Sequence, residues 1–208
     1  MKERPILFSA PMARAILEGR KTMTRRVIKP QPVALGDEGR RTSYSWRGGI
    51  YALQFYPDRS DILDRCPYGQ PGDRLWVREA WLYDDYMHDM TEGVPDLPGG
   101  AYSHRLVYRA SNPDYPMTIG SERWHPSIHM PRWASRILLE IASVRVERVQ
   151  DISDTDAERE GVGGNDPGGM LSFREHFREL WDSINAKRGY GWDTNPWVWV
   201  VEFKKVDP

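Results

Sequence analysis

The stretch Leu17-Glu-Gly-Arg-Lys-Thr-Met-Thr-Arg-Arg26 joins a predicted helix to a predicted strand. Ser9 and Pro11 are typical of a helix start, because serine caps the first turn and proline fits it, so we expect a helix over 11–18. Gly19 ends that helix, since glycine adopts the left-handed conformation readily. The stretch therefore predicts an exposed corner that carries four cations and two threonine hydroxyls.

The rest of the chain predicts a mixed α+β domain. Stretches 29–49, 84–100 and 111–134 are rich in glycine, proline and polar residues and are expected to be irregular. Apolar alternation predicts strands, and capping residues with helical spacing predict helices after Ser153 and after Ser172. The predicted strands cover 6–8, 20–28, 50–56, 74–81, 102–110, 136–149 (with a bulge) and 197–206. This order favours a mainly antiparallel, barrel-like sheet with flanking helices.

Composition limits the classes of function. The chain has 208 residues with 29 basic and 30 acidic side chains, so we expect one domain and only local contacts with a nucleic acid. The single cysteine, Cys66, allows no internal disulfide. The N-terminus lacks the apolar run of a signal peptide or a membrane span, so we expect a cytoplasmic protein with no membrane contact.

The corner itself suggests chemistry. If Lys21 is partly desolvated beside Arg20, Arg25 and Arg26, its pKa should fall, and a neutral amine can take the proton of the Thr24 hydroxyl. A regular strand would send residues three apart to opposite faces, so this pairing requires an irregular corner or a lysine stem that reaches around. The alternative for the same stretch is a solvated turn with cations along a strand edge.

Four motifs resemble the ASCH domain family of the PUA-like superfamily. Gly19-Arg-Lys-Thr-Met-Thr-x-Arg26 resembles its GRKT-x-T-x-R signature, and Gly72-Asp-Arg-Leu-Trp-Val77 resembles its GD-x-L-x-V strand entry. Asp156-Ala-Glu-Arg-Glu-Gly161 is similar to its A-x-x-EG helix, and the strand from Trp197 to Phe203 is similar to its closing strand. The amino-acid sequences of 72–79 and 128–136 resemble those of the prophage-borne branch of this family.

This resemblance implies a PUA-like β-barrel with insertions at about 29–70 and 82–135, and RNA or a modified nucleoside as ligand. Some members are cofactor-free amidohydrolases that remove the acyl group from N4-acylcytidine. By motif match, Lys21 is the general base, Thr24 the nucleophile and Glu160 the general acid. Glu160 also precedes Gly161 at a predicted helix end, where the helix dipole favours a protonated carboxyl.

Other residues are candidates for substrate binding. Three arginines can hold phosphate: Arg20, Arg25 and Arg26. Trp76 can stack on a base, and Glu79 can accept a hydrogen bond from the amine of that base or replace Glu160 as the acid. Strand alternation places Trp76 and Glu79 on opposite faces, so packing is an alternative for Trp76.

The same sequence features allow two other functions, and one histidine spacing suits a metal. A non-catalytic RNA-binding ASCH module, or a prophage accessory or morphogenesis protein that binds protein through its long loops, are the alternatives to the enzyme. His125 and His129 have a spacing that suits zinc, but Pro126 interrupts a helix there and no third ligand is evident, so we expect no metal.

Overall fold

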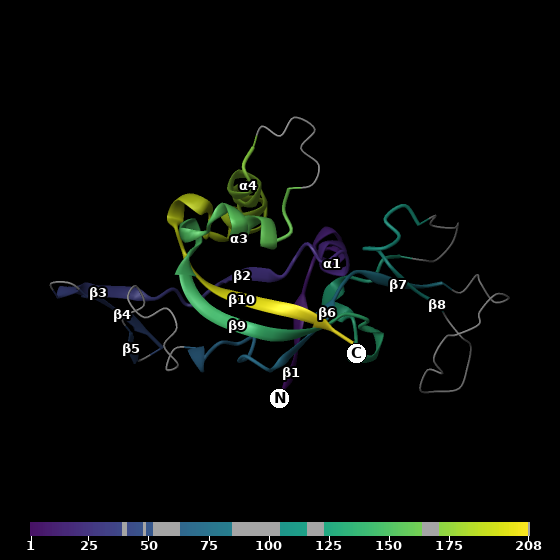
Figure 1. Ribbon diagram of the computed structural model, residues 1–208, viewed down its shortest axis with the longest axis horizontal. Coiled ribbons are helices and arrows are strands. Elements are labelled where there is room, and N and C mark those ends of the chain that lie inside the picture. Colours follow the sequence, from purple (N-terminus) through teal and green to yellow (C-terminus); the bar gives the residue numbers. More distant parts are fainter. Residues whose placement is uncertain are drawn as a thin grey trace.

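A curved sheet of five strands forms the centre of the molecule (Figure 1). The computed structural model describes residues 1–38, 41–47, 49–51, 63–84, 105–115, 123–163 and 171–207. The sheet order is β1-β6-β9-β10-β2, in which β1 pairs with β6 in parallel and the other pairs are antiparallel. Its strands are β1 (Glu3–Leu7), β2 (Met23–Val27), β6 (Arg74–Arg78), β9 (Leu138–Arg148) and β10 (Trp197–Val206).

Residues 197–201 of β10 are buried on both faces of the sheet, which explains their continuous apolar sequence, whereas β9 alternates buried apolar residues with partly exposed ones. Trp197 and Trp199 face a core that includes α1 (Ala10–Leu17). Val198 and Val200 face the opposite core, beneath α3 (Asp154–Arg159) and α4 (Phe173–Asn185). The sheet is therefore covered by α1 on one face and by α3 and α4 on the other.

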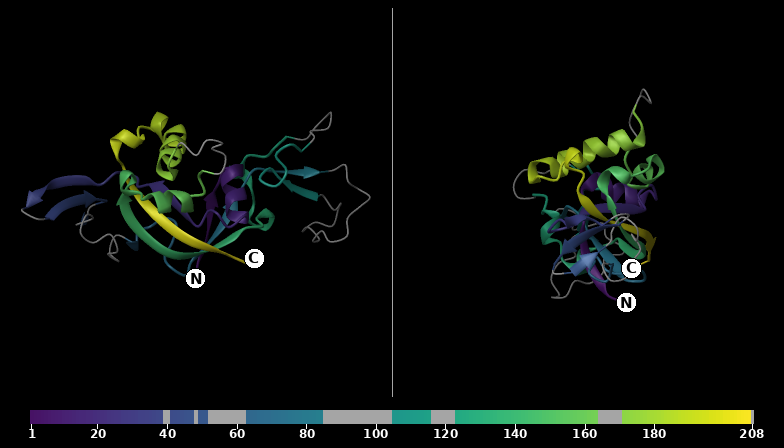
Figure 2. Two further views of the ribbon diagram at one scale, coloured as in Figure 1. Left: turned by 45° about the horizontal axis from the view of Figure 1, so that its top comes forward. Right: turned by 90° about the vertical axis from the view of Figure 1, so that its left-hand side faces the viewer.

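Two small sheets extend at opposite ends of the molecule (Figures 1 and 2). One contains β3 (Val33–Glu38), β4 (Arg41–Trp46) and β5 (Gly49–Tyr51), and the other pairs β7 (Trp81–Asp84) with β8 (Arg105–Tyr108). The remaining helices are single 3-10 turns: η1 (Ser127–His129), η2 (Arg132–Ala134), η3 (Val149–Asp151), η4 (Ala186–Arg188) and η5 (Trp192–Thr194).

The α+β class is confirmed, and within the described residues the sheet is open, because no ladder joins β1 to β2. The bulge expected in 136–149 is present, since the register of β9 against β10 skips Ala142. No helix in the described part of the chain is both long and apolar enough to cross a membrane.

Two predictions about strands were wrong. Residues 29–49 were expected to be irregular, but β3 and β4 pair as a hairpin, anchored by Trp46, which is buried and donates to the Pro30 carbonyl at 2.8 Å. Stretch 74–81 was expected to be one strand, but the chain leaves the main sheet after Arg78, and Trp81 begins the pairing with β8. Residues 52–56 of the predicted strand 50–56, and most of 84–100, lie outside the described residues.

The end of α3 lies directly against the corner that follows α1. The Ser153 hydroxyl caps α3 by accepting from the Asp156 amide at 3.1 Å, as expected. The Thr22 amide then donates to the Arg159 carbonyl at 2.9 Å, and Lys21 and Glu160 form an isolated antiparallel bridge. Gly161 follows with φ of +80°, and a Cβ there would lie 2.9 Å from the Cβ atoms of both Ala15 and Lys21.

This close approach generates a prediction. Gly161→Ala should lower the free energy of unfolding by about 1–2 kcal/mol, because alanine disfavours the left-handed backbone conformation. The contact of the new Cβ with Ala15 and Lys21 should lower it by about 1–3 kcal/mol more. Gly189→Ala is the matched control, because Gly189 has φ of +81° but nothing within 4 Å of an added Cβ. Urea unfolding of the three proteins measures the difference. Equal losses in the two variants would show that α3 can move away from α1 at no cost.

Candidate active site

A cavity of about 710 Å³ straddles the outer edge of β2. β2 is an outer strand of the sheet, so alternation sends Thr24 and Arg26 to one side and Arg25 and Val27 to the other, and all four line the cavity. Its walls come from the start of α1, the segment around Trp46, residues 65–68, and α4. The three residues predicted to be catalytic, Lys21, Thr24 and Glu160, all line this one cavity.

Lys21 is held at the corner by an unusually dense set of contacts. Gly19 adopts φ of +75°, and the Lys21 amide donates to the Ala15 carbonyl at 3.0 Å, so the chain turns sharply before β2 begins at Met23. The Lys21 side chain is only 3% exposed. Its Nζ donates to Glu160 Oε2 at 2.7 Å and to the Glu160 backbone carbonyl at 2.6 Å.

Burial lowers the pKa of Lys21 from its ordinary value, because removing water disfavours the charged amine. The carboxylate of Glu160 opposes this shift, while the guanidinium groups of Arg26 and Arg25 add to it. The direction predicted from the sequence is therefore confirmed, although Arg20 does not contribute. A lowered pKa makes Lys21 a better proton acceptor near neutral pH than an exposed lysine.

Thr24 lies within β2, opposite Val201 of β10, and is 4% exposed. Lys21 lies three residues earlier, where a regular strand would place it on the other face. Both line the cavity because the corner before Met23 is irregular, which is one of the two conditions set out from the sequence. Thr24 and Lys21 are therefore lining residues of the same cavity.

Glu160 is the residue that closes α3, and its carboxylate lies between two cations. Besides the contact with Lys21, its Oε1 accepts from Arg25 Nη1 at 3.4 Å, and the residue is 4% exposed. The sequence led us to expect a carboxyl influenced mainly by the end of a helix. Instead, the closest charged groups around this carboxyl are the side chains of Lys21 and Arg25.

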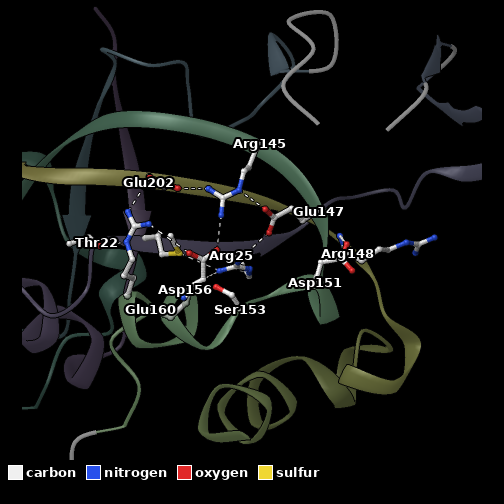
Figure 3. Close-up of polar contacts among 12 residues, drawn as sticks. Thr22, Arg25, Arg145, Glu147, Arg148, Asp151, Ser153, Asp156, Glu160 and Glu202 are labelled. Atoms are coloured by element: carbon white, nitrogen blue, oxygen red, sulfur yellow. Dashed lines mark hydrogen bonds and ion pairs between the residues drawn. The ribbon is translucent and has the colours of Figure 1, made fainter. Parts of the chain in front are cut away.

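Arg25 connects this pair to a charged network on the sheet surface beneath α3 (Figure 3). Its Nη2 donates to Asp156 Oδ2 at 2.9 Å and to Glu147 Oε2 at 3.0 Å. Arg145 binds Asp156, Glu147 and Glu202. These partners could not be predicted from the sequence, apart from the alternation that puts Arg145 and Glu147 on one face of β9.

Three predicted substrate-binding residues lie outside the cavity lining. Arg20 is exposed and pairs with Glu18, and Trp76 lies in β6, where the Arg78 guanidinium stacks 5.3 Å from its ring. Glu79 is buried, and both of its oxygens accept from Arg136, at 2.9 and 3.1 Å. Glu160 lines the cavity and Glu79 does not, which favours Glu160 over Glu79 as the acid.

Sequence reasoning missed several side chains of the cavity. Trp199 was assigned to the core, yet it also lines the cavity together with Phe8, Trp46 and Tyr68. These rings come from four separate segments of the chain, so no local pattern in the sequence predicts that they meet.

His125, one of the two histidines considered as zinc ligands, stacks against Trp81 with 4.7 Å between ring centroids. The described residues contain no group of three or more potential metal ligands.

Comparison of the chain with family models, with curated proteins and with solved structures found no match. The assignment of a function therefore depends on the motifs and on the geometry of the cavity.

The ion pair itself generates a prediction. Lys21→Met should lower the free energy of unfolding by about 3–5 kcal/mol, because it leaves the Glu160 carboxylate buried without its closest cation. The double variant Lys21→Met/Glu160→Met removes both charges and should recover much of that loss. Lys204→Met is the control, since it breaks an exposed pair with Glu140 and should change stability little.

Chemical denaturation of the wild-type protein, of the single variants Lys21→Met and Glu160→Met, of the double variant and of Lys204→Met measures these effects. A double variant as unstable as the sum of the two single variants would contradict the coupling of Lys21 with Glu160.

Proposed function

We propose that the cavity at β2 is the active site of an amidohydrolase that removes the acyl group from N4-acylated cytosine nucleosides. The observation that carries this proposal is the convergence of Lys21, Thr24 and Glu160 on one cavity, with Lys21 and Glu160 in contact at 2.7 Å. Thr24 is the nucleophile, Lys21 the base and Glu160 the acid. No cofactor takes part in these roles.

The contact between Lys21 and Glu160 supplies both required protonation states in one step. Transfer of a proton from Lys21 Nζ to Glu160 Oε2 converts the ion pair into a neutral amine and a carboxylic acid. Burial favours this transfer, because the neutral pair has no charge to desolvate. The amine can then accept a proton from Thr24, and the acid can give one to a leaving group.

Acylation uses these two groups in turn. The Thr24 oxygen attacks the amide carbonyl while its proton passes to Lys21, and the tetrahedral intermediate forms. The bond from the carbonyl carbon to the exocyclic nitrogen breaks as Glu160 protonates that nitrogen, which releases cytidine. The enzyme now carries an ester on Thr24, a protonated Lys21 and an ionised Glu160.

Deacylation returns each group to its starting state. The Glu160 carboxylate accepts a proton from water, whose oxygen attacks the ester carbonyl. The Thr24 oxygen leaves and takes its proton from Lys21, so the carboxylic acid product departs. The enzyme again holds a neutral amine beside a carboxylic acid, which is the pair that began the cycle.

Membership of the ASCH family and a PUA-like fold are part of the same proposal. All four motifs fall on elements that build the sheet or the site: 19–26 forms the corner and β2, 72–77 enters β6, 156–161 ends α3, and 197–203 belongs to β10. The five-stranded sheet is also strongly bent along β9 and β10, as a barrel wall requires (Figure 2).

A non-catalytic RNA-binding module is the second candidate, because seven cationic side chains line the cavity. Such a module should lose affinity for RNA steeply as salt rises, whereas hydrolysis of a neutral nucleoside should barely respond. Measuring both activities of the purified protein at low and at physiological salt separates the two functions.

The test of the enzyme is release of cytidine from N4-acetylcytidine, followed by chromatography. Thr24→Ser should retain activity because the hydroxyl remains, and Thr24→Val should abolish it at nearly constant shape. Thr22→Val is the matched control: Thr22 lies outside the cavity lining and accepts only a long contact, 3.3 Å, from Arg159. Turnover that persists in Thr24→Val would remove Thr24 as the nucleophile, and no turnover by the folded wild-type protein would remove the proposal.

A further inference from the structure

The charges around the cavity are strongly unbalanced. Among the described residues its lining carries seven lysine or arginine side chains and a single carboxylate, that of Glu160. Lys21 and Arg25 both contact that carboxylate, and Arg25 also binds Asp156 and Glu147 outside the cavity. Arg26, Lys29, Arg47 and Arg188 also line the cavity and contact no carboxylate in the described part of the chain.

Arg26 is the most informative of these cations. It contacts no carboxylate among the described residues: its Nη2 donates to the Leu7 carbonyl at 2.6 Å, and its guanidinium stacks 5.0 Å from the Phe8 ring. Its Nε is buried and has no hydrogen-bond partner. Burial also lowers the pKa of Arg26, because desolvation disfavours the charged guanidinium, and Tyr68 and Glu160 oppose this shift.

Unsatisfied buried donors are rare in native proteins, so the Nε of Arg26 calls for a partner that the described residues do not supply. Three further cations of the lining, Lys29, Arg47 and Arg188, also have no carboxylate partner in the described part of the chain. Arg47 Nη2 donates to the backbone carbonyl of Lys29 at 3.0 Å, and its guanidinium lies 5.0 Å from the Trp46 ring, while Lys29 Nζ lies 5.1 Å from the Tyr190 ring. A cavity lined by several guanidinium and ammonium groups suits phosphate, whose oxygens accept several charge-assisted hydrogen bonds.

The position of Arg26 relates this charge to the proposed chemistry. Arg26 lies two residues after Thr24 on the same face of β2, a separation of roughly 7 Å along the strand. One ligand can therefore reach both residues. The aromatic rings of Trp46, Tyr68 and Trp199 line the same cavity and offer surfaces on which a base can stack.

We infer that Arg26, with Lys29 and Arg47, forms a phosphate subsite, so that the ligand of this cavity is a phosphorylated cytosine nucleotide unit rather than a free nucleoside. The identity of the base rests on the proposed function, whereas the phosphate rests on the cations of the lining that contact no carboxylate among the described residues. The phosphate belongs either to a free nucleotide or to a phosphodiester strand, and the two sources share the same recognition chemistry.

Calorimetric titration of the full chain with cytidine and with cytidine 5′-monophosphate tests the subsite. The wild-type protein should bind the monophosphate about tenfold or more tightly than cytidine, and this preference should decrease as salt rises from about 50 to 200 mM. Arg26→Gln should abolish the preference while binding of cytidine persists. Arg178→Gln is the charge-matched control, because Arg178 is an exposed residue of α4 outside the lining and should leave the preference unchanged.

Equal affinity of the folded wild-type protein for the two ligands would overturn the inference, as would a preference that survives in folded Arg26→Gln. If Arg26→Gln fails to fold by circular dichroism, the wild-type comparison and its salt dependence still decide. A cytidine trinucleotide without a terminal phosphate identifies the source: tighter binding than the monophosphate indicates a strand, and weaker binding indicates a free nucleotide.

None of these ligands carries an acyl group, so the outcome is independent of catalysis. A monophosphate preference without turnover of any acylated substrate would keep the subsite and remove the amidohydrolase. Turnover of N4-acetylcytidine without a monophosphate preference would keep the amidohydrolase and remove the phosphate subsite.

Discussion

The buried ion pair between Lys21 and Glu160 determines how the two halves of the site meet. Lys21 belongs to the corner after α1, and Glu160 ends α3, which lies 139 residues later in the chain. Two buried charges are tolerated only when they satisfy each other, so the fold must bring these elements together with little error. Gly161 permits that approach, since a side chain there would collide with Ala15 and Lys21.

The surrounding charges extend the pair from the cavity to the sheet surface. Arg25 contacts Glu160 on one side and Asp156 with Glu147 on the other, and Arg145 joins both of these acids (Figure 3). Each group in such a network restricts its neighbours, which keeps the carboxylate of Glu160 in one position. Arg26, Lys29 and Arg47 line the same cavity and contact no carboxylate in the described part of the chain.

Local signals in the sequence predicted the elements that build the site. The serine cap of α3, the glycine after α1 and the apolar run of β10 each depend on neighbouring residues alone, and all three occur as expected. The corner residues Lys21 and Thr24 were found through a motif. The hairpin of β3 and β4 was missed, because its strands are polar and lie in a stretch rich in glycine and proline.

Contacts between distant segments could not be predicted from one sequence. Glu79 was a candidate because its carboxylate can accept a hydrogen bond from a base, but Arg136, 57 residues later, engages that carboxylate. Likewise, Trp46, Tyr68 and the residues of α4 meet at the cavity only through the tertiary fold. Pairings of this kind depend on the order of strands in the sheet, which local propensity does not determine.

The most direct measurement for the central claim is the mass of the intact protein after acid quenching during turnover of N4-acetylcytidine. The account predicts a covalent adduct with the mass of one acetyl group, located on Thr24 by peptide mapping and absent from Thr24→Val. Turnover with no acylated protein at any time point, or an adduct on another residue, would contradict the assignment of Thr24 as the nucleophile beside the Lys21–Glu160 pair.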